Sequence, residues 1–364
     1  MNKLEAILQK TKDIENNFKY KRVLFIGSES YDGPIITIIE GLHKLGFEIL
    51  TYNKSNINSW FCNKIITNLI DIEKNVDFVL SNLHWGTRWD LYKEFNHKVL
   101  YILIDGDDDN NCKSWRDKYN KYKRGYKTED INNIGSNELL SHRYMIDIDN
   151  YIPDIIFKTQ KFTTEGIYLP FGINNSYIEF NQSKTTHQRQ IDIAHFPGPG
   201  IEREKTTQVI NNNLNKYNII NKQIYGEMIV DKKINNNCIN DKNIHSWHRW
   251  KTCDKYFETI NDSKICICEP APGGWDSKRP WEILAQGSLL IYYKPVGFND
   301  TEYSIDNISS YCKCKNYNDM IQKCQFLLQN QEILEEKRKE CYENGIKYFT
   351  AEPIARYFLW NIIN

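Results

Sequence analysis

Short apolar runs alternate along the chain with longer stretches of helical spacing, a pattern typical of parallel sheets covered by helices. The first run, VLFIG at 23–27, precedes an amphipathic stretch that ends at Gly46, a common C-terminal stop signal for a helix. Further runs of strand length follow it: FEILTYN, VDFVLSNL, VLYILID, DIIFKT and GIYLPFG. The pattern predicts a doubly wound α/β domain over residues 1–173.

A polar stretch rich in Asn, Ser and Thr, residues 174–190, is typical of a linker between domains. After it the alternation starts again with IDIAHF and continues through SKICICEP and SLLIYYK. We therefore predict a second Rossmann-like domain over 191–345. The last segment, 346–364, has helical apolar spacing from Ile354. We expect a helix that packs either back on the first domain or on the second domain, which precedes it in the chain.

Length and composition agree with two globular domains. At roughly 150 residues per domain, 364 residues correspond to about two. Apolar residues make up 40 % of the chain, enough for a full core, which excludes generic disorder. Because 47 basic residues balance 47 acidic ones, nucleic acid is not the expected partner, although a local basic patch is compatible with a total of zero.

The sequence predicts a cytoplasmic protein. Its first residues, MNKLEAILQKTKDIENNFKYKR, lack the apolar core of a signal peptide, and no apolar run is long enough to span a membrane. The ten cysteines are then interpreted as reduced thiols. Cys266 and Cys268 have CxC spacing inside an apolar run, which favours strand core over a zinc site.

The segment 263–291 is the richest in candidate chemistry. A buried strand is followed by a Pro/Gly loop, and then by a helix that opens just after Lys278 and Arg279. Ligands of open parallel sheets bind beyond the carboxyl ends of the strands, and free N–H groups at the start of a helix suit a phosphate. Gly273 and Gly274 let the backbone approach such a group closely. The segment therefore predicts a phosphate-binding loop.

Three charged side chains around the start of this helix extend the prediction. Lys278 and Arg279 neutralise a diphosphate, with Arg279 able to bind in bidentate fashion, and Glu282 accepts hydrogen bonds from a ribose diol. The alternative is structural: the two cations are solvated and Glu282 complements the helix dipole.

This segment resembles the donor-binding segment of GT-B glycosyltransferases, especially the CgeB/YkvP-like group related to the group 1 glycosyl transferases. Arg279, Glu282, Ala285 and Gly287 fill the positions of its Arg-x-x-Glu and Ala-x-Gly pattern. YLPFGIN, IDIAHFPGPGIERE and VLYILIDGD are similar to further motifs of the family, in order along most of the chain. The resemblance implies two Rossmann-like domains that face each other across a cleft and transfer a sugar from a nucleotide sugar.

The resemblance also implies roles for individual residues of the second domain. The expected donor-binding residues are Arg203, Lys278 and Arg279 at the diphosphate, Glu282 at the ribose, and Gly273, Gly274 and Asp276 near the transferred sugar. Ala271 and Pro272 stand where the better-known retaining families place a Glu, so retention and inversion both stay open. The implied donor is a UDP- or GDP-sugar, no metal or other cofactor is required, and the acceptor is a glycan, a protein or a small molecule.

The first domain is expected to supply the acceptor side. Glu29, Ser30 and Gly33 belong to the loop after the first apolar run, where a ligand approaches. His84 follows another run and is a candidate general base, while Trp85 beside it is suited to stack on a sugar; the alternative for His84 is a structural role in its loop.

Asp105, at the end of the run VLYILID, is the second catalytic candidate of the first domain. The carboxylates at 107–109 after it are similar to the metal-binding DxD motif of single-domain transferases, but an exposed acidic loop fits a two-domain chain better. No metal site is therefore predicted.

Three classes of function fit this pattern. The first is a glycosyltransferase acting on an acceptor hydroxyl. The second is a non-catalytic GT-B-like protein of a surface or assembly, which would bind a nucleotide without turnover. The third is a nucleotide-sugar epimerase, which product analysis without an acceptor separates from the first.

Overall fold

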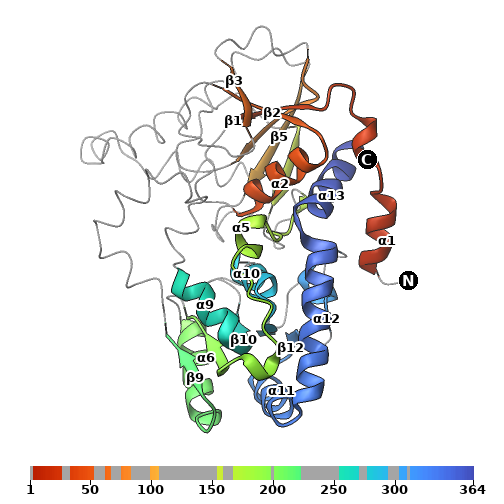
Figure 1. Cartoon of the computed structure of the whole chain (residues 1–364). Coiled ribbons are helices and arrows are strands. Elements are labelled where there is room, and N and C mark those ends of the chain that lie inside the picture. Colours follow the sequence, from red (N-terminus) through yellow and green to blue (C-terminus); the bar gives the residue numbers. More distant parts are fainter. Residues whose placement is uncertain are drawn as a thin grey trace, which may run out of the picture. The chain divides into compact units, whose positions relative to one another are not determined.

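The computed structural model describes twelve stretches of the chain (Figure 1): 3–26, 33–52, 62–66, 75–82, 99–105, 154–158, 167–197, 201–222, 254–269, 277–293, 303–309 and 312–364. The chain forms two compact units. Unit 1 comprises Met1–Leu8 and Pro170–Pro353, and unit 2 comprises Gln9–Leu169 and Ile354–Asn364. Two helices, α1 (Lys3–Lys10) and α13 (Ala351–Ile363), contribute residues to both units.

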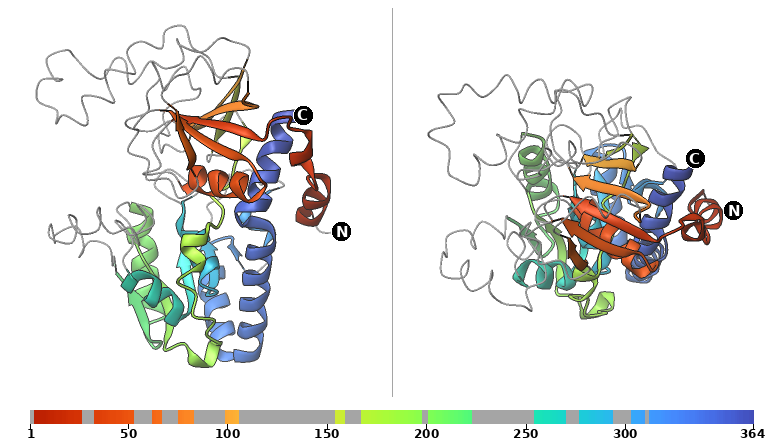
Figure 2. Two further views of the ribbon diagram at one scale, coloured as in Figure 1. Left: turned by 45° about the horizontal axis from the view of Figure 1, so that its top comes forward. Right: turned by 90° about the horizontal axis from the view of Figure 1, so that it is seen from above.

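Unit 2 contains a parallel sheet with the order β3-β2-β1-β4-β5-β6-β7 among the described residues. Its strands are β1 (Arg22–Ile26), β2 (Glu48–Tyr52), β3 (Cys62–Ile66), β4 (Phe78–Asn82), β5 (Leu100–Asp105), β6 (Ile155–Lys158) and β7 (Ile167–Tyr168). The helix α2 (Gly33–Lys44) packs on β2, as Figure 2 shows, and a 3-10 helix, η1 (Ile14–Asn17), precedes β1. This is the doubly wound sheet that the sequence predicts for the first half of the chain.

The helix α2 ends as its sequence predicts. Gly46 has a φ of +84°, and its N–H donates to the carbonyl of His43 while the N–H of Phe47 donates to that of Leu42. These are the two hydrogen bonds of a Schellman motif, which needs a residue with positive φ after the helix. The prediction that the helix stops at Gly46 is confirmed.

A cluster of aromatic rings lies in the core of unit 2. Phe358 from α13 lies with its ring centroid 4.7 Å from that of Phe157 and 6.0 Å from that of Phe78. Phe47 and Phe18 extend the cluster, with their ring centroids 6.3 and 5.8 Å from that of Phe78. The last helix of the chain thus contributes to the core of unit 2, together with strands from the first half of the sequence.

Unit 1 contains a second parallel sheet, with the order β12-β11-β10-β8-β9 among the described residues. Its strands are β8 (Ile191–His195), β9 (Ile219–Asn221), β10 (Ser263–Cys268), β11 (Leu289–Tyr293) and β12 (Lys313–Cys314). Its helices, including the 3-10 helices η4 and η6, are α5 (Asn175–Ile178), η4 (Thr186–Gln188), α6 (Ile201–Asn213), α9 (Asp254–Asp262), α10 (Arg279–Ala285), η6 (Ile305–Asn307), α11 (Tyr317–Gln329) and α12 (Gln331–Phe349). Both halves of the chain therefore have the architecture that the alternating pattern predicts.

Burial of apolar strands and helix faces holds unit 1 together. Cys266 and Cys268 on β10 are fully buried, which confirms that they are core residues. Trp281 on α10 is buried too, with its ring centroid 5.0 Å from that of Phe349 at the end of α12. At the start of α11, the side chain of Asn316 accepts a hydrogen bond from the N–H of Asp319, as an N-cap does.

The polar segment 174–190 is part of unit 1 and packs against it. It contains α5 and η4, and Thr186 and Arg189 within it are buried. The hydroxyl and N–H of Thr186 both donate to Glu335 on α12. Polar composition is compatible with such packing because the buried side chains of Thr186 and Arg189 form hydrogen bonds with acceptors elsewhere in unit 1.

Among the described stretches, the structure contains no helix that is both long enough and apolar enough to cross a membrane.

The aromatic cluster of unit 2 generates the first testable expectation. Phe358→Ala removes a fully buried ring, and we expect it to lower the free energy of unfolding by about 3–5 kcal/mol, measured by urea denaturation followed by circular dichroism. Ile363→Ala, in the same helix but 46 % exposed, is the matched control and should change it by less than about 0.5 kcal/mol. Equal losses in the two variants would show that α13 does not contribute to the core through Phe358.

Candidate functional site

The strand order of unit 1 places a topological switch point between β8 and β10. From β8 the chain passes to β9 on one side, and its later strands β10, β11 and β12 lie on the other. In open α/β sheets, ligands bind beyond the carboxyl ends of the strands at such a point, because the two connections diverge there. The carboxyl ends of β8 and β10 are therefore the first place to look for a site.

Three polar residues lie at the ends of neighbouring strands at this edge, and the middle one, His195, contacts the other two. His195 is the last residue of β8, directly opposite Asn221 of β9 in the sheet register. Its Nδ1 lies 2.8 Å from Asn221 Oδ1, and its Nε2 lies 2.7 Å from Oε2 of Glu269, the residue after β10. His195 and Glu269 are 0 % and 2 % exposed. None of the three is predicted as a site residue from the sequence, where their position at the ends of apolar runs is the available signal.

Arg203, which the resemblance predicts to bind the donor diphosphate, lies next to these residues. It lies in the first turn of α6, with its Nε 3.6 Å from Glu269 Oε1. Both atoms are buried, and neither has a hydrogen-bond partner among the described residues. Asn221 ties α6 to the sheet, because its Nδ2 donates to the carbonyl of Thr207, one turn further along the helix. The switch point thus combines a buried carboxylate with a buried guanidinium.

The helix α10 brings a second charged group to unit 1. Glu282 is 1 % exposed and accepts a hydrogen bond of 2.8 Å from the hydroxyl of Tyr256 at its Oε2. Its Oε1 lies 3.6 Å from the ammonium of Lys278 and has no hydrogen-bond partner among the described residues. Burial, and secondarily the charge of Glu282, raises the pKa of Tyr256 well above its ordinary value, so the phenol keeps the proton that it donates.

The pKa of the Cys268 thiol is affected by the charges of both predicted arginines, Arg203 and Arg279. Burial raises its pKa to about 12; the charges of Arg279 and Arg203 lower that pKa, and the charge of Glu269 raises it. All three charges are therefore felt at the end of β10. The charges of Arg203 and Arg279, which are far apart in the sequence, therefore both act on the buried thiol at the end of β10.

The structure brings Lys278, Glu282 and Arg279 together on and beside α10, and Arg203 to the same sheet edge. Gly33 is the first residue of α2, and Asp105 is the last residue of β5. The other predicted site residues lie outside the described residues: Glu29, Ser30, His84, Trp85, Gly273, Gly274 and Asp276.

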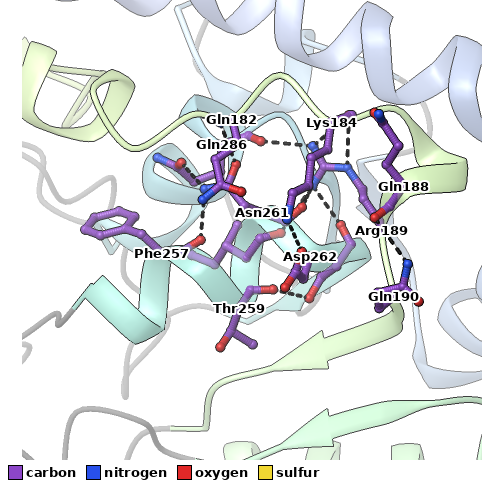
Figure 3. Close-up of polar contacts among 12 residues, drawn as sticks. Gln182, Lys184, Gln188, Arg189, Gln190, Phe257, Thr259, Asn261, Asp262 and Gln286 are labelled. Atoms are coloured by element: carbon purple, nitrogen blue, oxygen red, sulfur yellow. Dashed lines mark hydrogen bonds and ion pairs between the residues drawn. The ribbon is translucent and has the colours of Figure 1, made fainter.

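A buried arginine holds the C-terminal end of α10 (Figure 3). Arg189, 2 % exposed, donates to the carbonyls of Asn261 and Gln286, at 2.8 and 3.2 Å, at the ends of α9 and α10. It also donates to the carbonyl of Ser263 and the hydroxyl of Ser288. Burial lowers its pKa to about 10, so the guanidinium stays charged at neutral pH and complements the negative ends of two helix dipoles.

Two amide side chains complete this support. Asn261 Nδ2 donates to Gln286 Oε1 at 2.8 Å and to the carbonyl of Phe180 at 2.7 Å, and its Oδ1 accepts from the N–H of Gln182 (Figure 3). Gln286 Nε2 in turn donates to the carbonyl of Tyr177. The helix that carries Arg279 and Glu282 is therefore fixed at its far end by hydrogen bonds from three segments.

In the parts of the chain that the structure describes, no three His, Cys, Asp or Glu side chains are grouped so as to hold a metal ion.

Comparison with known proteins gives a fold. No protein-family model and no curated protein sequence matches the chain. A glycosyltransferase from Rickettsia africae has a similar structure, with a TM-score of 0.51, 12 % identity, and coverage of 94 % of this chain and 97 % of its own. BGT of phage T4 in complex with UDP-glucose has 11 % identity, the same coverages and a TM-score of 0.46, too low to support an argument. With its two parallel sheets, the chain has the two-domain, Rossmann-like GT-B fold.

The support of α10 gives the second expectation. Arg189→Met leaves buried carbonyl groups without their donor, and we expect it to lower the free energy of unfolding by about 3 kcal/mol or more, measured by urea denaturation. Lys184→Met is the control, because it removes only the half-exposed ion pair with Asp262 next to Arg189 and should cost less than about 1 kcal/mol. A loss for Arg189→Met no larger than that of the control would contradict this account.

Proposed function

We propose that the protein is a glycosyltransferase that moves a sugar from a nucleotide-diphosphate sugar to an acceptor hydroxyl. The observation that carries the proposal is a pair of buried arginines beside a topological switch point: Arg203 lies next to Glu269 at the carboxyl end of β10, and Arg279 is the first residue of α10. The GT-B fold and the sequence resemblance to the CgeB/YkvP-like group support it.

The arginines are suited to the diphosphate of the donor. A guanidinium offers parallel N–H donors that match phosphate oxygens, and a site that excludes water strengthens this attraction. As the bond to the sugar breaks, negative charge grows on the departing diphosphate, and fixed positive charges stabilise it. Arg203 and Arg279 supply these charges in the proposal, and Lys278 adds a third, so that no metal ion is required.

Glu282 is suited to the ribose. Its Oε2 is held by Tyr256, which fixes the carboxylate, while its Oε1 keeps lone pairs that a ribose hydroxyl can use. Gly273, Gly274 and Asp276 lie between β10 and α10 in the sequence, and the proposal assigns them to the transferred sugar. The donor is a UDP- or GDP-sugar.

The acceptor side is assigned to unit 2. There the strand order reverses between β1 and β4, and the segments that follow these strands in the sequence contain Glu29 and Ser30, and His84 and Trp85. His84 is the proposed general base, Trp85 stacks on the acceptor sugar, and Asp105 at the end of β5 is a second catalytic candidate. The acceptor is a glycan, a protein or a small molecule.

The proposal includes a reducing, cytoplasmic location. Cys266, Cys268, Cys312, Cys314, Cys324 and Cys341 are buried free thiols, and burial raises the pKa of Cys266 to about 12, as for Cys268. A thiol with so high a pKa is a weak nucleophile, which suits a role in packing.

Binding and turnover test the proposal together. We expect Arg279→Lys, which keeps the charge and loses the planar fork, to raise the dissociation constant of the nucleotide diphosphate about 10-fold, measured by calorimetry. Glu282→Gln should raise it about 5-fold and, like Arg279→Lys, reduce hydrolysis of the nucleotide sugar, because the ribose loses a charged acceptor.

The control is Lys323→Ala, which removes a partly exposed ion pair with Asp319 on α11 of the same unit. A thermal-shift screen against UDP, GDP and CMP selects the ligand, since a ligand at 100 times its dissociation constant adds about 2.7 kcal/mol of stability. Wild-type affinity in both site variants, or no stabilisation by any of the nucleotides, would overturn the assignment.

A further inference from the structure

The charge that Arg203 can offer depends on a neighbouring histidine. His195 lies on β8, between β9 and β10, and each of its ring nitrogens faces a side chain at the end of one flanking strand. The protonation of this buried ring decides how the charge of Glu269 is compensated. The hydrogen bonds around it settle which nitrogens carry protons.

On one side, the orientation of Asn221 is fixed. Its Nδ2 donates to the carbonyl of Thr207 at 3.2 Å and to Asn211 Oδ1 at 3.0 Å, so its Oδ1 is the atom that faces His195. An amide oxygen only accepts hydrogen bonds. His195 Nδ1 therefore carries a proton and donates it to Asn221.

On the other side, Nε2 lies 2.7 Å from Glu269 Oε2, and both groups are buried. The other oxygen of Glu269 lies 3.6 Å from the guanidinium of Arg203, and a nearby positive charge favours the ionised carboxylate. An ionised carboxylate also only accepts hydrogen bonds. Both ring nitrogens thus face hydrogen-bond acceptors. Each acceptor receives a hydrogen bond when the imidazole carries two protons, and therefore one positive charge.

The consequence concerns the net charge at the switch point. A charged His195 cancels the charge of Glu269, so the guanidinium of Arg203 retains its own. With a neutral ring, Glu269 would pair with Arg203 instead, and the two would present no net charge to an anion. The geometry agrees with the first case: Glu269 Oε2 lies within hydrogen-bond distance of His195 Nε2, at 2.7 Å, whereas the ion pair of Glu269 Oε1 with Arg203 Nε is longer, at 3.6 Å, and has no hydrogen bond. Among the described residues, the thiol of Cys268 also lies at this strand end; burial raises its pKa to about 12, so it stays neutral, while Arg279 adds a further positive charge.

We propose that His195 and Glu269 are a positioning pair for the donor site: Glu269 orients Arg203, and a doubly protonated His195 compensates Glu269 so that Arg203 keeps a full positive charge for the diphosphate. This rests on the proposed function, in which Arg203 binds the diphosphate. Neither member of the pair touches the donor in this proposal.

A double-mutant cycle tests the pair with UDP and inorganic diphosphate as probes, measured by calorimetry. His195→Gln leaves the carboxylate of Glu269 uncompensated, and we expect it to raise both dissociation constants about 10-fold. The double variant His195→Gln with Glu269→Gln is neutral at both positions, and we expect its dissociation constants to return to within about threefold of wild type. Binding of uridine, which has no phosphate, should be unchanged throughout.

The control variant is Lys264→Gln. It removes the ion pair of 2.7 Å between Lys264 of β10 and Asp192 of β8, which joins the same two strands towards their amino ends. It should leave UDP binding unchanged. If wild type binds UDP and the double variant binds no more tightly than His195→Gln, the pair is merely structural and this inference is overturned, while the proposed function stands. If wild type binds neither probe, the proposed function and the assignment of Arg203 fail together.

A spectroscopic measurement decides the protonation even if a variant does not fold. In wild-type protein labelled with nitrogen-15 at histidine, both ring nitrogens of His195 should carry a proton at neutral pH. A signal of His195 with one unprotonated ring nitrogen would overturn the inference, whatever the binding results.

Discussion

The order of parallel strands decides where the charges of unit 1 gather. All carboxyl ends of a parallel sheet lie along one edge, and the helical connections diverge where the order reverses, between β8 and β10. Polar residues at the ends of β8 and β10 therefore lie close together at this edge. His195 and Glu269 meet there, and α6 adds Arg203 from the connection that follows β8. The order of the strands, more than any single sequence motif, determines which residues form the candidate site.

Two buried arginines of this unit illustrate different uses of the same side chain. Arg189 is surrounded by carbonyl and hydroxyl oxygens that its guanidinium satisfies, and its role is to hold the ends of α9 and α10. Arg203 faces a carboxylate without a hydrogen bond at its Nε. A buried donor left without such a partner is costly unless a ligand supplies one. The first arginine therefore stabilises the fold, and the second is suited to bind.

The sequence predicts the parts of this structure that depend on local pattern. The apolar residues at 23–26 lie in β1, Gly46 ends α2, and the proline at position 280 lies in the first turn of α10, because periodicity and stop signals act over a few residues. Arg203 was recognised because it lies in a motif. Asn221, His195 and Glu269 were not, because their contacts depend on which strands are neighbours, and alternation along a chain does not reveal strand order.

The segment 174–190 is a second case in which local sequence pattern does not predict contacts with distant residues. Its Asn, Ser and Thr content is typical of a linker, yet Arg189 within it finds acceptors about 70 to 100 positions further along the chain. Local composition shows that a segment is polar, but it does not show whether carbonyl groups from distant parts of the chain will accept hydrogen bonds from it. Buried polar networks of this kind become visible only once the strands are placed.

The central claim is that a nucleotide diphosphate binds at the switch point of unit 1. Hydrogen–deuterium exchange followed by mass spectrometry, with and without saturating UDP or GDP, tests it most directly, because it locates binding along the chain. Exchange should slow in peptides covering 191–205 and 277–286. Binding that leaves both segments unchanged, or slows exchange only in unit 2, would contradict the claim.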